Sequence, residues 1–374
     1  MKENTNEVDR QYREILNRIL EKGHKNLGER TGVGTLSLFG EQMRFKMSDG
    51  LPVLTTKEVY LKGVICELLW FLGNHTRSPE YKDYPIDNIK YMLDNNVNIW
   101  VGDLYKNFIN YINNPENEDE VLKWLISDGS KLREMNEKQF ISALKNNREF
   151  SLKFGGIGAG YGWQWNHFGG DYYTYKRSFS KLGGTLYSGI NQIQGLIKGL
   201  KENPQGRRHL VTAWNPSDLD RIVLPPCHYS FSCYARELTY EERQEWIFDN
   251  LGIGMEEYLG TDDEIPRYGL SLMHHQRSAD FLLGVPFNIT SYAILLHLIA
   301  KECNMVADEL VMSFENTHLY LNHLEAAKEQ LKRSSEFDLP TISIADKSIS
   351  ELKINDIEIH NYKSLGKIKA PLNN

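Results

Sequence analysis

The chain has 374 residues, a formal net charge of −7 and a sequence pI near 5.9. Hydrophobic residues make up 41% and charged residues 25%, which is typical of a globular protein with a buried core and excludes collagen, a coiled coil and global disorder. A mildly acidic chain lacks the basic face that duplex nucleic acid usually requires, so we expect no direct nucleic-acid partner.

The cysteines and the apolar stretches indicate a cellular compartment. The four cysteines contain no CxxC pair, so the sequence predicts neither a zinc site nor a redox dithiol. Four cysteines are too few for a disulfide scaffold, so we expect the protein in the reducing cytoplasm. The first 16 residues lack the apolar core of a signal peptide. The most apolar stretch, 281–300, contains Pro286, Asn288 and His297, which is typical of a buried helix and not of a membrane span.

In chain order, the first half combines helical and strand patterns. Apolar residues at helical spacing predict an amphipathic helix over 8–22, and alternating residues after the glycine turn of ERTGVG predict a strand ending near 45. The segment 64–74 (VICELLWFLGN) predicts a buried helix that ends at Gly73. Residues 101–154, rich in Asn, Glu and Lys, are typical of an insertion with a helix at 119–126.

The second half continues this mixture. The sequence predicts an amphipathic helix over 191–203 and two strands, over 209–216 and 228–235, on either side of the turn at 224–226. The acidic segment that follows, 236–267, is expected to be a second insertion. A strand over 270–280 and helices over 289–303 and 318–333 follow, and the tail 334–374 alternates short strands with turns. No linker interrupts the pattern, so we expect one α+β domain over 1–374 with insertions at 101–154 and 236–267.

Cys227 is the first candidate for chemistry. It follows two prolines in LPPCHYS, a stiff turn that would display the side chain. A nucleophilic thiol requires a lowered pKa, which neighbouring arginines supply. A buried, inert cysteine is the ordinary alternative, and we adopt it for the other three cysteines, which lie in apolar patterns. These are Cys66, Cys233 and Cys303.

Arginines at strand ends form a second candidate group. Arg30 lies in the ERTG turn, Arg207 and Arg208 precede a strand, and Arg277 with Ser278 follows one. Guanidinium groups suit phosphate oxygens because of their fork of donors. Taken singly, each is more often a solvated charge or a structural ion pair, so the phosphate interpretation depends on their occurrence with Cys227.

Further polar residues occur within apolar patterns. Glu67 lies in the helix CELLWFLG, where burial would raise its pKa and suit it to proton transfer, although a structural carboxylate is as plausible. Asn288 at a predicted helix start is either an N-cap or an amide that recognises a ring with a donor and an acceptor. His318 and Tyr320 either bind a sugar hydroxyl or belong to the core. The glycines at 155–162 fit neither GxGxxG nor a P-loop, so no dinucleotide or ATP site is indicated.

These motifs occur together in one order, and together they resemble the thymidylate synthase family, which includes the pyrimidine-nucleotide hydroxymethylases. The resemblance covers most of the chain outside 101–154 and 236–267. It rests on these segments: RTGVGTLSLFGEQMRF, LTTKEVYLKGVICELLWFLGN, NNVNIW, YGWQW, RRHLVTAWNP, LPPCHYSF, QRSADFLLGVPFNITSYA, THLYLNH and KIKAP.

The resemblance implies a mixed sheet with flanking helices, a sheet-to-sheet homodimer, and a deoxynucleotide bound beside 5,10-methylenetetrahydrofolate, with no metal. It implies that the Cys227 thiolate adds to C6 of uracil and makes C5 nucleophilic. Glu67 would manage protons near O4, and Tyr161 would assist removal of the C5 proton. Asp280 and Asn288 complete the catalytic set that the resemblance implies.

The resemblance also implies binding residues. For the nucleotide phosphate these are Arg30, Arg277 and Ser278, with Arg207 and Arg208 reaching in from the partner subunit. For the sugar 3′-hydroxyl they are His318 and Tyr320. For the folate they are Lys57 at the glutamate tail, Asp280 at the pterin, and Ile99, Trp100, Leu224, Leu283, Gly284 and Phe287. Asn288 selects the base, because a neutral amide donates to O4 and accepts from N3–H of uracil, whereas an aspartate suits cytosine; we therefore expect dUMP over dCMP.

Several residues depart from the family pattern on the folate side. Trp100 is followed by Val101-Gly102-Asp103-Leu104 in place of Asp-Glu-Trp, Ser232 replaces a glutamine, His275 replaces a tyrosine, and Glu315-Asn316 replaces Gly-Asp. The chain ends Pro371-Leu372-Asn373-Asn374, where synthases have small apolar residues that exclude water.

A polar C-terminus would admit water to the carbon joined to C5. The sequence therefore favours a dUMP hydroxymethylase that makes 5-hydroxymethyl-dUMP for a pathway replacing thymine in DNA, cytoplasmic and of possible virus origin. Thymidylate synthase itself, making dTMP and dihydrofolate, is the close alternative. A catalytically dead relative is less favoured because the candidate residues are intact, and a Cys-His hydrolase would leave the arginines unexplained.

Overall fold

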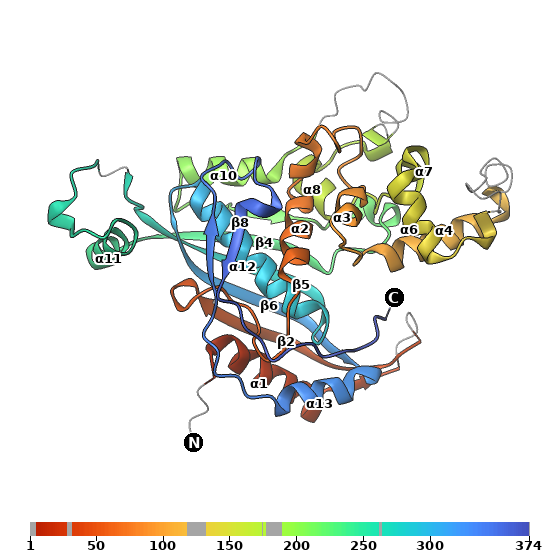
Figure 1. Ribbon diagram of the computed structural model, residues 1–374, viewed down its shortest axis with the longest axis horizontal. Helices are drawn as coiled ribbons and strands as arrows, with labels where there is room; N and C mark the ends of the chain where they lie inside the picture. Colours follow the sequence, from red (N-terminus) through yellow and green to blue (C-terminus); the bar gives the residue numbers. More distant parts are fainter. Residues whose placement is uncertain are drawn as a thin grey trace. The chain divides into compact units, whose positions relative to one another are not determined.

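The computed structural model of the protein describes residues 5–27, 32–117, 132–173, 175–176, 189–261 and 264–373 (Figure 1). The chain divides into two compact units. The sheet unit comprises residues 1–65, 193–212 and 227–373, and the helical unit comprises residues 66–192 and 213–226. The predicted single domain over 1–374 with two insertions stays a prediction.

A six-stranded mixed sheet forms the sheet unit, in the order β1-β2-β6-β5-β4-β3. Its strands are β1 (His24–Asn26), β2 (Thr35–Lys46), β3 (Leu210–Thr212), β4 (His228–Glu237), β5 (Tyr268–Asp280) and β6 (Val306–Tyr320). β5 and β6 pair in parallel and the other neighbours are antiparallel. β7 (Thr341–Ile344) and β8 (Ile357–His360) form a separate hairpin. The α+β class with a mixed sheet is confirmed.

Helices cover one face of this sheet (Figure 1). α12 (Gly284–Glu302) is apolar around most of its circumference and packs on β5 and β6. α1 (Glu7–Lys22) packs its buried stripe against β2 and against α13 (Leu324–Lys332). α10 (Gln192–Glu202) is amphipathic, as its sequence predicts. The core is the layer between the sheet and these helices, with Phe231, Leu272 and Phe314 buried on the covered face.

Two predicted helix boundaries were wrong. α12 begins at Gly284, five residues before the predicted start, so Asn288 lies inside the helix and is not its N-cap. The predicted helix over 318–333 begins only at Leu324, because residues 318–320 end β6 and residues 321–323 form a 3₁₀ turn, η8. The whole of β6 was missing from the prediction. At its end the four consecutive residues 317–320 are all buried, so this part of the strand lacks the alternation that marks a half-buried strand.

The helical unit contains α3 (Lys90–Asp94), α4 (Val101–Asn113), α6 (Glu137–Asn146), α7 (Arg148–Phe154) and α8 (Tyr161–His167), and α2 (Leu61–Phe71) contains the boundary between the units. Helices α4, α6 and α7 share an aromatic core, with ring centroids of Phe108 and Phe140 4.9 Å apart and those of Phe150 and Phe154 4.8 Å apart. The helix expected at 119–126 lies outside the described residues.

Close packing explains the glycine-rich segment 155–162. Gly158 has φ 91°, and a Cβ atom there would lie 1.9 Å from the carbonyl oxygen of Arg221. A Cβ atom on Gly156 would lie 2.3 Å from a carboxylate oxygen of Asp87. The glycines therefore permit close backbone approach within the helical unit.

The acidic segment after β4 is an excursion between two strands, as predicted. It contains α11 (Tyr240–Leu251), which begins with a capping box between Thr239 and Glu242. Arg236 at the end of β4 binds both Glu242 and Asp308 of β6, at 2.7 Å in each case, and so fixes the base of α11 to the sheet.

Candidate active site

Cys227 immediately precedes β4 and is partly exposed, whereas the other three cysteines are buried. Its carbonyl oxygen accepts a hydrogen bond from the backbone nitrogen of Arg277 at 2.9 Å, which places it beside the Arg277-Ser278 pair of β5. Burial raises the pKa of Cys233 far above its ordinary value and that of Cys303 to about 11, so neither thiol is suited to nucleophilic attack. Cys66, Cys233 and Cys303 are buried, as their apolar sequence patterns predict.

The ends of three strands bring the nucleotide-binding candidates together. Because β4 runs antiparallel to β5 and β6 runs parallel to it, the start of β4 and the last residues of β5 and β6 lie at one edge of the sheet. Asp280 is paired with His318 across β5 and β6. His318 and Tyr320 are each 8% exposed, with ring centroids 5.3 Å apart. Ser278, His318 and Tyr320 thus occupy the same edge as Cys227.

Asn288 lies in the second turn of α12 with a fixed side chain. Its Nδ2 donates to Oε1 of Gln276 at 3.1 Å, and Gln276 in turn donates to the carbonyl of Ser278 at 2.9 Å. An amide has two N–H hydrogens and one carbonyl oxygen. After the bond to Gln276, Asn288 retains one donor and its acceptor, with no further partner among the described residues. This pair of groups matches the O4 and N3–H of uracil.

The turn from β5 into α12 carries the sheet unit's folate candidates. Oδ1 of Asp280 accepts from the backbone nitrogens of Leu282 and Leu283 at 3.1 and 3.0 Å. Lys57 is buried and its Nζ donates to the carbonyl of Leu282 at 2.6 Å. Burial lowers the pKa of Lys57 to about 8, against the opposing attraction of Asp280. Leu283, Gly284, Phe287 and Asn288 form a partly exposed face on the first turns of α12.

Glu67 lies on α2 within the helical unit. Its Oε1 accepts a hydrogen bond from the indole Nε1 of Trp100 at 2.8 Å. Burial raises the pKa of Glu67 to about 7, and the neutral Trp100 donor offsets only part of that effect. A carboxyl with this pKa can exchange a proton near neutral pH, and Glu67 also has a structural partner in Trp100, so its role in proton transfer stays a prediction.

Trp100, the partner of Glu67, belongs to an aromatic cluster. The ring centroid of Trp100 lies 6.2 Å from that of Trp70 and 5.9 Å from that of Tyr161, and Tyr161 stacks on Phe71 at 4.7 Å. Tyr161 is 2% exposed and Trp100 7%, whereas Ile99 is 50% exposed. Leu224 is partly exposed. The helical unit therefore brings Glu67, Trp100 and Tyr161 together and leaves Ile99 at its surface.

The arginine candidates differ in setting. Arg207 and Arg208 are exposed just before β3, and neither forms an ion pair with any residue that the structure describes. Arg277 is partly exposed on β5. Arg30 lies outside the described residues.

Two polar residues near Cys227 were not predicted from the sequence. Gln276 is 2% exposed and orients Asn288, and His228 pairs its Nδ1 with the hydroxyl of Tyr292 at 2.9 Å. Burial lowers the pKa of His228 to about 3, so the ring is neutral at ordinary pH. The inward alternation of β5, in which Gln276 follows Leu270, Leu272 and His274, is the signal that could have identified Gln276.

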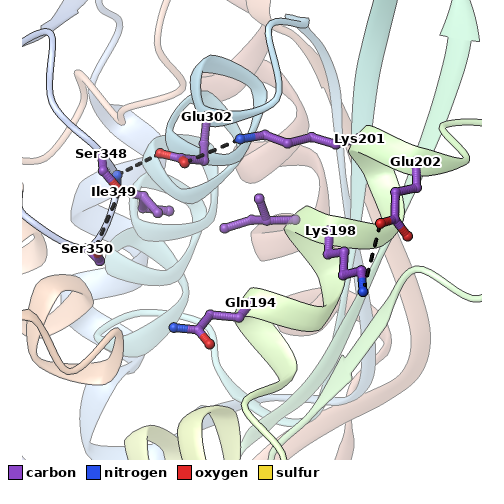
Figure 2. A pocket seen from close by; sticks show the side chains of 9 residues that line it. Gln194, Lys198, Lys201, Glu202, Glu302, Ser348, Ile349 and Ser350 are labelled. Atoms are coloured by element: carbon purple, nitrogen blue, oxygen red, sulfur yellow. Dashed lines mark hydrogen bonds and ion pairs between the residues drawn. The ribbon is translucent and has the colours of Figure 1, made fainter.

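A groove of about 380 Å³ elsewhere on the sheet unit contains none of the predicted site residues (Figure 2). It lies between α10, the end of α12 and residues 348–350. Lys201 pairs with Glu302 at 3.5 Å and Lys198 with Glu202 at 3.8 Å, while Glu302 also accepts from the backbone nitrogen of Ile349 at 2.8 Å. Because its charges are paired with one another, this groove is not the candidate site.

The structure thus brings a partly exposed cysteine, an arginine and the amide of Asn288 to one edge of a mixed sheet. The chain belongs to the thymidylate synthase family, whose model, "Thymidylate synthase", matches residues 10–373. Members are one-carbon transferases that act on dUMP with methylenetetrahydrofolate as co-substrate, and this chain is an enzyme of that class.

Similar proteins include three bacterial thymidylate synthases. The enzyme of Mesoplasma florum is 37% identical over 362 residues, covering 96% of this chain and 98% of the relative. Those of Staphylococcus haemolyticus and Listeria monocytogenes are 36% and 35% identical, covering 98% and 97% of this chain and 99% of each relative. These names fit the alternative that the sequence left open, the synthase, better than the hydroxymethylase that its departures favoured.

The described residues contain neither a metal-binding cluster nor a membrane-spanning helix. In the ranges that the structure covers, no group of three or more His, Cys, Asp or Glu side chains is arranged to hold a metal ion. Within the same ranges, no helix combines the length and apolarity needed to cross a bilayer.

Proposed function

We propose that the protein is a thymidylate synthase that converts dUMP to dTMP, with methylenetetrahydrofolate converted to dihydrofolate. The observation that carries the proposal is the set Cys227, Arg277, Gln276 and Asn288 at one edge of the sheet. It supplies a nucleophile, a phosphate ligand and a uracil-recognising amide within two neighbouring strands and one helix.

In this proposal the nucleotide is held by three groups of side chains. Arg277 and Ser278 bind the phosphate together with Arg30, His318 and Tyr320 bind the sugar 3′-hydroxyl, and Asn288 donates to O4 and accepts from N3–H of the ring. Gln276 supports this assignment because it fixes which way the Asn288 amide faces. Cytosine presents an amino group and a bare N3 instead, so it would leave polar groups unpaired.

The chemistry attributed to this chain's residues begins at sulfur. The Cys227 thiolate forms a bond to C6 of uracil, and the ring electrons move toward C5 and O4. Glu67, with a pKa near 7, delivers a proton on the O4 side and accepts it again when the C6–sulfur bond breaks. Tyr161 assists loss of the C5 proton. Cys227 leaves as thiolate, so it is unchanged over the cycle.

The side chains assigned to the folate fit that co-substrate by type. Asp280 presents a carboxylate for the pterin, and Leu283, Gly284 and Phe287 offer a partly exposed apolar face beside it. Ile99, Trp100 and Leu224 are the apolar residues assigned from the helical unit, and the buried Lys57 ammonium lies beneath the 280–284 turn. The folate supplies the one-carbon unit and, for a methyl product, the hydride.

A hydroxymethylase is the second candidate, favoured by one feature of the C-terminal tail. Asn322 and Asn373 exchange reciprocal side-chain hydrogen bonds of 2.8 and 3.1 Å, so a polar amide pair lies where the family pattern has small apolar side chains. Water, in place of hydride, would then reach the carbon joined to C5 and give 5-hydroxymethyl-dUMP with tetrahydrofolate. The proposed cytoplasmic location is the same for both products.

We further infer a homodimer formed through the sheet face opposite α12. On that face Tyr234 is 63% and Leu210 is 55% exposed, and Met273 and Val311 line a shallow cavity of about 540 Å³. Arg207 and Arg208 precede β3 at the edge of the same sheet, which suits them to reach a partner's phosphate site. Sedimentation of wild type and Tyr234→Glu tests this assembly, and a monomeric wild type would refute it.

The product decides between the two candidates. The protein is incubated with dUMP and methylenetetrahydrofolate, and the nucleotide is analysed by mass spectrometry. A gain of CH2 with formation of dihydrofolate supports the synthase, whereas a gain of CH2O with tetrahydrofolate establishes the hydroxymethylase. Absence of both products, from a folded protein that binds dUMP, would overturn the proposed function.

A further inference from the structure

Arg333, just after α13, faces a cluster of backbone carbonyls. Its Nη1 lies 3.1 Å from the carbonyl oxygen of Thr56, 3.2 Å from that of Leu365 and 2.9 Å from that of Gly366. Its Nη2 lies 3.4 Å from the carbonyl of Lys367. A guanidinium is always charged and presents a rigid fork of donors, so it can hold two chain segments at once.

One of these segments is the root of the C-terminal tail, here called the strap (residues 362–373). The strap runs beside the loop 54–59: the nitrogen of Leu365 donates to Thr55 at 2.8 Å, and the nitrogen of Glu58 donates to Gly366 at 3.0 Å. Gly366 has φ 85°, a left-handed conformation that side-chain-bearing residues rarely adopt. This turn presents the carbonyls of residues 365 and 366 to the same nitrogen of Arg333.

The other segment leads to the folate candidates. Thr55 and Thr56 are anchored from the opposite side by the buried carboxylate of Asp9, which accepts from both backbone nitrogens and both hydroxyls. Lys57 follows directly, and its Nζ holds the carbonyl of Leu282 in the turn closed by Asp280. Hydrogen bonds therefore connect the strap, through Arg333 and residues 55–57, to the turn at 280–284.

We propose that Arg333 is a positioning residue that sets the strap and the Lys57 segment in one arrangement. It touches neither substrate; it acts through the backbone of residues 56 and 365–367. This inference rests on the proposed function, because it concerns the folate side of that site. Loss of Arg333 is therefore expected to raise KM for methylenetetrahydrofolate and to let the strap detach more often, without a change in the affinity for dUMP.

The test compares Arg333→Gln and Arg333→Lys with Lys332→Gln, which removes the same charge from the exposed neighbouring residue. We expect Arg333→Gln to raise KM for methylenetetrahydrofolate at least fivefold, with KM for dUMP within twofold of wild type, and Arg333→Lys to be intermediate. Lys332→Gln should match wild type. Thermal melts establish that each variant is folded.

A second readout needs no turnover. Lys367 and Lys369 lie in the strap, so limited trypsin digestion with mass spectrometry measures how often the strap detaches. We expect trypsin to release the C-terminal peptide at least fivefold faster from Arg333→Gln than from Lys332→Gln. Addition of dUMP plus tetrahydrofolate should slow this cleavage in Lys332→Gln but not in Arg333→Gln. Equal cleavage rates and an unchanged folate KM in a folded Arg333→Gln variant would overturn the proposal. If the product assay shows a product other than dTMP, that result would contradict the proposed function but not the positioning role of Arg333.

Discussion

Replacing Glu67 with glutamine should change stability in a manner that depends on pH. In the folded chain burial raises the pKa of this carboxyl from 4.5 to about 7. Between these pH values the unfolded chain has released the proton that the folded chain retains. The unfolded state therefore binds fewer protons, and the free energy of unfolding falls as pH rises through this window. Below pH 4.5 both states are protonated and Glu67 has no such effect.

The size of the effect follows from the shift in pKa. Each pH unit of separation is worth about 1.4 kcal/mol, so the interval from 4.5 to about 7 sets an upper limit of roughly 3 kcal/mol. Partial exposure of the side chain reduces this, and we expect a penalty of about 1–2 kcal/mol above pH 7. Glutamine keeps an oxygen that can accept from the Trp100 indole, but it does not ionise. The free energy of unfolding of the variant should therefore not fall through this pH window.

The assay is urea unfolding of wild type and Glu67→Gln at pH values from 4 to 9. The difference between the two free energies of unfolding should grow through pH 4.5–7 and then level off, while Glu80→Gln, at an exposed position of the same unit, should show no such growth. The kcat of Glu67→Gln should fall by about 10²–10⁴-fold, because the amide cannot carry the proton. Wild type and Glu67→Gln curves that stay parallel over the whole range would refute the reasoning.

Three further substitutions test the site and its scaffold. Cys227→Ser should lower kcat by about a thousandfold or more while dUMP still binds, measured by single-turnover assay and equilibrium dialysis, and near-normal turnover would exclude covalent catalysis. Asn288→Asp should shift preference from dUMP toward dCMP by about a hundredfold in the ratio of kcat/KM values, since a carboxylate has no N–H to donate to O4 of uracil but accepts from the amino group of cytosine; an unchanged ratio would show that Asn288 does not select the base. Asp9→Ala should lower the free energy of unfolding by about 3 kcal/mol, because it leaves the Thr55 and Thr56 donors without their buried acceptor; urea unfolding beside the exposed Glu14→Ala control measures this, and an equal, small loss in both would contradict it.

The sequence was informative wherever a pattern is local. The helical spacing of Tyr12, Ile15 and Ile19 predicted α1, and the apolar density of residues 289–300 predicted a buried helix. The order of the motifs identified the family before any geometry was known, and the partial exposure of Cys227 against three buried cysteines agrees with its selection as the candidate nucleophile. The helix predictions depend on neighbours within a few residues, and the resemblance depends on residue identities and their order, so the sequence itself carries both.

Tertiary structure decided the rest, because it depends on segments far apart in the chain. Pairing of residues 306–320 with both β2 and β5 made a strand of a segment partly expected to be helical. The start of α12 at Gly284 excluded the N-cap alternative for Asn288, and the packing of α12 against β5 brought its amide to Gln276. Burial raised the pKa of Glu67 against the opposing effect of its hydrogen bond from Trp100. The meeting of the strap with the 54–59 loop gave Arg333 its carbonyl partners. Composition and spacing do not encode which distant backbone approaches a side chain; packing of the folded chain does.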